Sequence, residues 1–92
     1  MSKTRKNSKI IYKQLRLKSD WTTTYEQMLN VFGVECDFLK DQGSVEIGFS
    51  PSKQEKLIGC FLNSGWNLVA VSEDEKSICF HMTKQVEDET LQ

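Results

Sequence analysis

The chain has 92 residues, which is enough for one small domain but not for two. Its hydrophobic content of 38%, with five Phe and two Trp, supports a small core, and a single Pro argues against a disordered chain. No apolar run is long enough to cross a membrane, and the basic N-terminal segment is not followed by the apolar stretch of a signal peptide. These features predict a cytoplasmic protein without membrane contact.

Charge divides the sequence into two unlike parts. The first 18 residues carry seven of the 12 Lys and Arg residues and none of the 13 Asp and Glu residues. The rest of the chain is therefore strongly acidic. An asymmetry of this kind concerns partners rather than fold. We predict a basic arm at residues 1–8, a single domain at residues 9–84 and an acidic tail at residues 85–92.

The first predicted elements are a strand and a helix. Residues 9–18, KIIYKQLRLK, alternate in polarity and predict a strand with one apolar face. A helix follows within residues 23–33. Thr23 and Glu26 have the spacing of a capping box, and Gly33 suits the residue that ends a helix. The buried face of this helix is predicted from residues at helical spacing: Tyr25, Met28, Leu29 and Phe32.

A hairpin and a second helix come next. Residues 34–38 and 45–49 each alternate in polarity and are separated by the turn KDQGS, which predicts a hairpin with an acidic outer face. Ser50 and Pro51 then suit the cap and first turn of a helix. The buried stripe of this helix consists of Leu57, Ile58, Phe61 and Leu62. Gly59 weakens a helix, so we interpret it as the mark of a close contact with the sheet.

The segment after Gly65 predicts a second hairpin. Gly65 ends the helix, and Trp66 begins a strand as a large core residue whose indole N–H reaches a carbonyl or water. Leu68 and Ala70 share its face, while Val69 and Val71 occupy the other face. This arrangement predicts an interior strand that is covered on both sides.

These units form a weak internal repeat of helix, glycine, strand, charged turn and strand, with 32 residues between Gly33 and Gly65. After one initial strand, two such units give the order β-α-β-β-α-β-β. The predicted fold is therefore a two-layer α+β domain of ferredoxin-like order with an extra C-terminal strand. Both helices pack on one face of an antiparallel sheet.

No residue pattern points to catalysis. His81 is the single histidine, and the three cysteines (Cys36, Cys60 and Cys79) are widely spaced rather than paired like zinc ligands. We predict reduced cysteines that pack as small hydrophobic residues. Phosphate-binding loops and nucleophile motifs are absent from the sequence. The chain is therefore predicted to be no enzyme and to hold neither cofactor nor metal.

The basic segment is the strongest indication of function. Its charges are interleaved with an aromatic residue and followed by another, a pattern that can neutralise phosphates and stack on bases. The candidate binding residues are Lys3, Arg5, Lys6, Lys9, Tyr12, Lys13, Arg16, Lys18 and Trp21. The favoured interpretation is a small regulator, adaptor or inhibitor that works through protein–protein contacts. The alternative is nucleic-acid binding by the basic arm and first strand. Pairing of exposed edge strands in a homodimer is a further prediction.

The segment FLNSGWNLVAV resembles a family of small uncharacterised bacterial proteins. In these proteins a short helix ends in Gly-Trp and continues into a strand of the type LVxV, followed by a hairpin. The resemblance covers residues 54–82. It implies a compact α/β module and no known chemistry.

Overall fold

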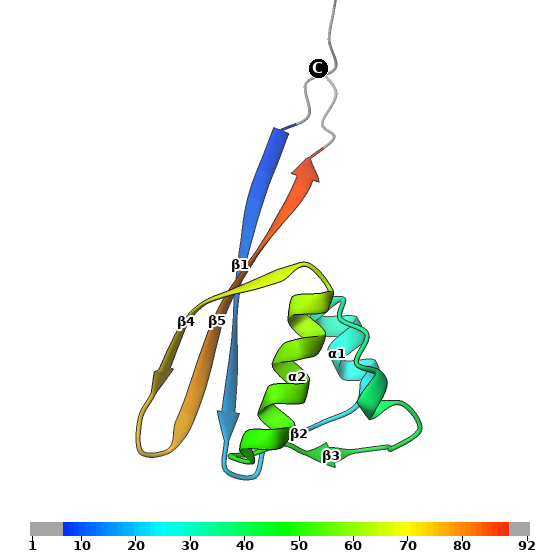
Figure 1. Ribbon diagram of the computed structural model, residues 1–92, viewed down its shortest axis with the longest axis vertical. Coiled ribbons are helices and arrows are strands. Elements are labelled where there is room, and N and C mark those ends of the chain that lie inside the picture. The colour runs from blue at the N-terminus through cyan, green and yellow to red at the C-terminus, as the bar shows by residue number, and fades with distance from the viewer. Residues whose placement is uncertain (1–6, 89–92) are drawn as a thin grey trace, which may run out of the picture.

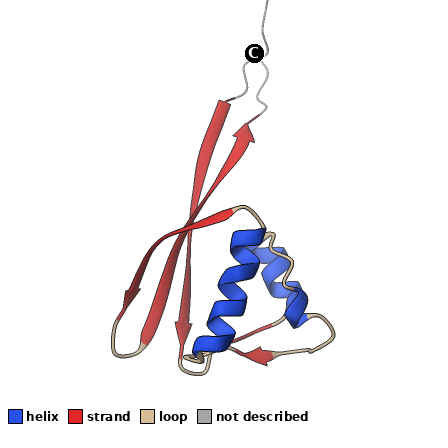
Figure 2. Ribbon diagram, viewed as in Figure 1, coloured by secondary structure: helices blue, strands red, loops and turns tan. Residues whose placement is uncertain are grey.

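The computed structural model describes residues 7–88 of the chain (Figure 1). Its elements are β1 (Asn7–Lys18), β2 (Thr22–Thr23), α1 (Tyr25–Phe32), the 3₁₀ helix η1 (Asp37–Leu39), β3 (Val45–Glu46), α2 (Pro51–Asn63), β4 (Trp66–Glu73) and β5 (Ser77–Asp88). An antiparallel sheet has the strand order β1-β5-β4, and β2 pairs with β3 in a small second sheet. Both helices lie on one side of the larger sheet (Figure 2). The α+β class, the antiparallel pairing and the two helices are thus as predicted.

The ferredoxin-like order is not found in the described chain, because residues 34–38 form no strand. Val34 and Cys36 alternate as in a strand, but both are fully buried and the chain then turns into η1. Asp41 and Gly43 follow with φ angles of 62° and 68°, a left-handed conformation that breaks a regular hairpin. Val45 pairs instead with Thr23, which is buried. Alternation revealed the buried positions but not the pairing partner.

The end of β5 lies within the segment that the sequence assigns to the acidic tail. β5 continues to Asp88, and residues 85–88 pair with residues 7–10 of β1. This end of the β1–β5 pair projects beyond the helices as a two-stranded ribbon (Figure 1). Backbone pairing with β1 therefore extends β5 beyond the last residues that alternate in polarity. Residues 1–6 and 89–92 of the predicted arm and tail lie outside the described residues.

The helix caps follow the sequence closely. α1 begins one residue later than predicted. The hydroxyl of Thr24, not that of Thr23, accepts from the backbone N–H of Gln27 at 3.1 Å, and the side-chain oxygen of Gln27 accepts from the backbone N–H of Thr24. Gly33 ends α1 with a φ of 68°, as predicted. α2 begins with Ser50 as its cap and Pro51 in its first turn, also as predicted. The shift at α1 arises because Thr23 is taken up by β2.

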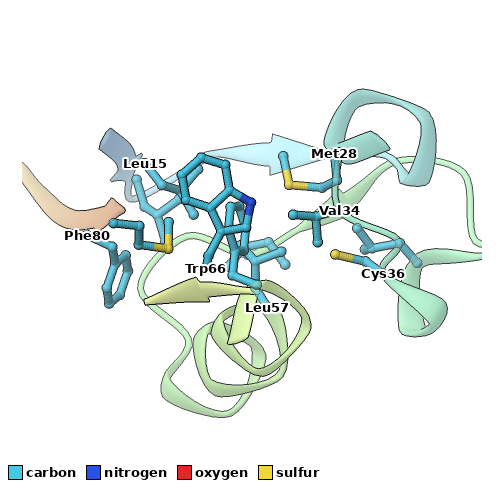
Figure 3. Packing of buried hydrophobic residues seen from close by; sticks show 12 residues of the cluster. Leu15, Met28, Val34, Cys36, Leu57, Trp66 and Phe80 are labelled. Atoms are coloured by element: carbon cyan, nitrogen blue, oxygen red, sulfur yellow. The ribbon is translucent and has the colours of Figure 1, made fainter. Parts of the chain in front are cut away.

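Trp66 is the core residue that the sequence indicated. Only 4% of it is exposed, and it packs edge-to-face on Phe61, with ring centroids 6.3 Å apart. Figure 3 shows Trp66 among the residues of the buried cluster. Its indole N–H donates to the Phe32 carbonyl at 3.3 Å. The same cluster includes Leu57 of α2 and Met82 of β5. Trp66 therefore joins the start of β4 to both helices.

The rest of β4 differs from the prediction, because it is an edge strand and not an interior one. Leu68, Val69 and Val71 are 37%, 57% and 50% exposed. A β-bulge at Val69 separates Leu68, which lies opposite Met82, from Ala70, which lies opposite His81. Both helices lie on one side of the sheet and leave its other face uncovered. A continuous run of apolar residues was therefore not sufficient to bury β4 on both faces.

Two glycines have opposite roles. A Cβ at Gly48, whose φ is 49°, would lie 2.3 Å from the Ser19 carbonyl oxygen, so only glycine fits this close approach of two backbones. A Cβ at Gly59 would meet no atom within 4 Å. The predicted close contact between Gly59 and the sheet is therefore wrong: this face of α2 is open.

Candidate functional site

The structure divides the predicted basic site among several places. Lys3, Arg5 and Lys6 lie outside the described residues. Strand alternation sends Lys9 and Lys13 to the helix side of β1, and it sends Tyr12, Arg16 and Lys18 to the opposite side. Trp21 follows β1, is partly buried against the core, and accepts backbone hydrogen bonds from Ile47 and Gly48 at 2.9 and 3.2 Å. The described residues of the set do not form one surface.

Lys13 has a structural role. Its ammonium donates to the Val31 carbonyl at 2.6 Å and lies 5.4 Å from the centre of the Phe32 ring. Both contacts fall in the last turn of α1, where carbonyl groups lack helical partners and a positive charge is favoured. Lys13 therefore ties β1 to the end of α1.

The sheet face opposite the helices, here called the open face, carries a network of polar side chains. Gln14 donates to the Tyr12 hydroxyl at 2.9 Å, and that hydroxyl bonds Nδ1 of His81. Nε2 of His81 lies 2.9 Å from Oγ of Ser72. The rings of Tyr12 and His81 stack with centroids 6.0 Å apart. The network thus crosses all three strands of the larger sheet.

The composition of this network differs from that of a nucleophilic catalytic triad. The tautomer of His81 sets the direction of its two bonds: either the Tyr12 hydroxyl donates to Nδ1 and Nε2–H donates to Ser72, or Nδ1–H donates to Tyr12 and Nε2 accepts from Ser72. A phenol rather than a carboxylate stands behind the imidazole, and it would stabilise an imidazolium poorly.

A second polar group lies where β4 turns into β5. Arg16 donates to Oγ of Ser77 at 3.1 Å, and Ser77 donates to Oδ1 of Asp74 at 3.3 Å. Hydrogen bonds from the backbone N–H groups of Lys76 and Ser77, both 2.8 Å long, hold the pKa of Asp74 below its ordinary value. Arg16 is thus occupied in fastening this turn.

A shallow apolar groove of ≈ 420 Å³ runs between α2 and the sheet. Its lining residues are Pro51, Gln54, Glu55, Ile58, Gly59, Leu62, Leu68 and Phe80. Gln54 also lines a neighbouring hollow with Phe49, Glu73 and Asp74. Among the described residues that line these two hollows there is no Lys or Arg. The groove is therefore mainly apolar, with one carboxylate, Glu55, in its lining and two more, Glu73 and Asp74, in the adjoining hollow.

Exposed apolar side chains extend this groove to the sheet edge. Leu62 is 50% exposed at the end of α2, and Leu68, Val69 and Val71 follow along β4. Val71 lies opposite Phe80 and so shares the helix side of the sheet with Leu68. We call Leu62, Leu68, Val71 and the groove residues the β4–α2 surface. A contiguous apolar area of this kind is typical of an interaction site.

The three cysteines are free, as predicted. Cys36 and Cys79 are buried, and Cys60 is half-buried. Burial, followed by a hydrogen bond with Cys60, raises the pKa of the Cys36 thiol far above its usual range, which keeps the thiol protonated and unreactive.

Residues 7–88 contain no cluster of three or more His, Cys, Asp or Glu side chains placed to hold a metal ion. The helices of this part of the chain, with eight and 13 residues, are too short to span a bilayer.

Comparison with known proteins returned no relative: neither a protein-family model, nor a curated protein, nor a solved structure matches the chain. The resemblance of residues 54–82 to small bacterial proteins therefore stays a prediction. Two surfaces of the molecule, the open face and the β4–α2 surface, are the candidates for function.

Sequence reasoning identified neither surface. The sequence shows His81 as the single histidine, but its hydrogen-bond partners Tyr12 and Ser72 come from other strands, and the sequence does not reveal the strand order. The exposure of β4 could have been predicted from the sequence. A chain with two predicted helices and several predicted strands has too few helices to cover both faces of a strand that is apolar on both sides.

Proposed function

We propose that this protein is a non-enzymatic binding module that recognises another protein through the β4–α2 surface. The observation that carries this proposal is the continuity of exposed Leu62, Leu68 and Val71 with the apolar groove beneath them. Burying such side chains releases roughly 25 cal/mol per Å² of apolar area. The surface has a shape and chemistry suited to an apolar protein segment.

Charge around the groove indicates the chemistry of that segment. Glu55 lines the groove, and Glu73 and Asp74 line the adjoining hollow. Complementary potentials steer association and disfavour wrong partners. The favoured partner therefore presents apolar side chains flanked by Lys or Arg.

Affinity capture from the native host with paired variants tests this function. Val71→Lys places a charge in the β4–α2 surface, whereas Ile10→Lys makes the same change at a 70%-exposed residue of β1. Proteins retained by wild type and Ile10→Lys but absent with Val71→Lys would support the proposal. Equal recovery with all three baits would contradict it.

Nucleic-acid binding is the second candidate, and the open face favours it. Tyr12, Arg16 and Lys18 lie on this face with His81, and the facing positions 77, 79, 81 and 83 of β5 hold no carboxylate. An uncovered antiparallel sheet with an aromatic residue and cations can stack bases and neutralise phosphates. The described face offers two such cations, one of which also fastens the β4–β5 turn.

Titration with fluorescent single-stranded RNA and DNA at several salt concentrations tests this candidate. Replacing Arg16 and Lys18 by Gln should weaken binding and reduce the salt slope by about one for each phosphate that is no longer neutralised. Tyr12→Ala should weaken binding without changing that slope. Absence of binding at low salt, or binding indifferent to these changes, would remove the candidate.

A further inference from the structure

We propose that the partner of β4 is a second copy of this chain, which pairs with the free edge of β4 so that two sheets join into one six-stranded sheet. This inference rests on the proposed function, because it assigns an occupant to part of the β4–α2 surface. Figure 1 shows β4 at one side of the larger sheet, with β5 as its neighbour.

The backbone of β4 is suited to such pairing. It bonds to β5 along one side, and its other side faces no strand in the described chain. Proteins commonly guard an exposed edge with Lys, Pro or a β-bulge. The sequence of β4, WNLVAVSE, has neither Lys nor Pro, and its one charged residue, Glu73, stands at its end. Of these guards β4 has only the bulge at Val69, and an apolar edge without Lys or Pro is a template for another strand.

The bulge at Val69 makes β4 symmetric about its own centre. On the helix side lie Trp66 and Leu68 before the bulge and Val71 and Glu73 after it. A regular strand alternates without interruption, so it is symmetric about a residue and never about a point between two residues. The extra residue moves the centre of symmetry of β4 to the point between Val69 and Ala70.

A two-fold axis at that point gives an antiparallel register in which opposite residues share a face, as strand pairing requires. Leu68 then lies opposite Val71 of the second copy, and Trp66 lies opposite Glu73 of the second copy. On the open face, Asn67 lies opposite Ser72 of the second copy, where amide and hydroxyl groups can bond. The remaining positions, Val69 and Ala70, lie at the axis.

The helix side of this register is complementary in both apolarity and charge. Two Leu68–Val71 pairs meet beside the axis, and each covers side chains that are 37% and 50% exposed in one chain. Glu73 of one copy lies on the same face as Lys84 of the other, two strands away, or about 10 Å between backbones. The Lys84 ammonium lies 5.8 Å from the centre of the Trp66 ring, over the strand that separates them. Long Glu and Lys side chains span that distance, so the axis generates two ion pairs.

Sedimentation equilibrium of the full chain, from about 1 μM to about 500 μM, tests the inference. Wild type should reach twice the mass of one chain. Val71→Lys should raise the dissociation constant at least about 30-fold, as expected for a charge at the centre of an interface. Ile10→Lys should leave the constant unchanged. Val71 is half-exposed in one chain, so its variant should fold, and circular dichroism checks this.

A charge exchange tests the register itself. Glu73→Lys and Lys84→Glu should each weaken association, and the double variant should recover much of the affinity, because both ion pairs are restored with reversed sign. A wild type that stays at the mass of one chain throughout, or a dimer indifferent to Val71→Lys, overturns the inference. A monomer whose captured proteins disappear with Val71→Lys overturns it and leaves the proposed function intact. A monomer without such proteins removes both.

Discussion

The two edge strands of the larger sheet differ in how well they are protected against pairing with another strand. β1 carries Lys9, Lys13, Arg16 and Lys18 along one strand, and charges of this kind discourage edge-to-edge pairing. β4 carries a single acid at its end and exposes Leu68, Val69 and Val71. Both edges have unpaired backbone groups in the described chain, but they differ in their side chains and in the bulge of β4. The side-chain difference is the reason for proposing association at β4 and not at β1.

Two of the charged residues of β1 also make hydrogen bonds within the chain. Lys13 fastens the end of α1, and Arg16 bonds Ser77 beside the β4–β5 turn. On β4, by contrast, the buried contacts are concentrated at Trp66. Side-chain contacts therefore fix the half of β1 that lies against the helices, whereas the buried side-chain contacts of β4 are confined to its first residue.

The largest effect is expected at the buried end of β4. Trp66→Ala should lower the free energy of unfolding by about 3–5 kcal/mol, because it removes a buried aromatic ring and leaves a cavity. Leu68→Ala, at a partly exposed site on the same strand, should cost less than about 1 kcal/mol. Urea denaturation measures both changes. Similar losses for the two variants would show that β4 is not held chiefly by its first residue.

An intermediate effect is expected on β1. Lys13→Met keeps the length of the side chain but removes its charge from the last turn of α1, and should cost about 1 kcal/mol, allowing for its partial exposure. Lys9→Met, at an exposed position of the same strand, is the matched control and should change stability little. Urea denaturation compares the two variants. Equal effects would contradict a structural role for Lys13.

A smaller effect of opposite sign is expected beside β4. Gly59→Ala should raise the free energy of unfolding by about 0.5–1 kcal/mol, because alanine favours helix and its Cβ has open space. Gly48→Ala should be destabilising, since its Cβ would collide with the Ser19 carbonyl. Thermal or urea unfolding distinguishes the two signs. A destabilised Gly59→Ala protein would mean that the groove side of α2 is packed after all.

The smallest effect concerns the turn between β4 and β5. Backbone hydrogen bonds lower the pKa of Asp74 below its ordinary value of 3.8. A carboxyl group whose pKa is lower in the folded state than in the unfolded state stabilises the folded state at pH values above its unfolded-state pKa. This contribution is lost as the pH falls through its folded-state pKa. Asp74→Asn should therefore unfold at a lower temperature than wild type at neutral pH, and the difference should shrink as the pH is lowered below 3.8. A difference that persists in acid would assign the effect to something other than charge.

Local structure was largely predictable from the sequence. The cap at Ser50, the left-handed Gly33 and the burial of Trp66 follow from short-range rules about hydrogen bonding and apolar area. The capping box moved by one residue because Thr23 and Thr24 both satisfy the pattern, and pairing with Val45 selected between them. Such choices depend on a segment more than 20 residues away.

The candidate surfaces were less predictable. Tyr12, Arg16 and Lys18 were named as binding residues from charge, but their shared face with His81 follows from the pairing of β1 with β5. The exposure of Val71 depends on strand order and on the bulge, which changes its side of the sheet relative to simple alternation. Neither strand order nor a bulge leaves a local mark in the sequence.

By itself, the sequence determined to within one residue where the helices begin, which residues seek burial and how unevenly charge is spread, because these follow from residue chemistry over a few neighbouring positions. Tertiary structure decided that β5 is the central strand, that residues 34–38 turn instead of pairing and that β4 lies at an edge. Those outcomes depend on which distant segments meet, and on two helices having too little surface to cover every apolar strand.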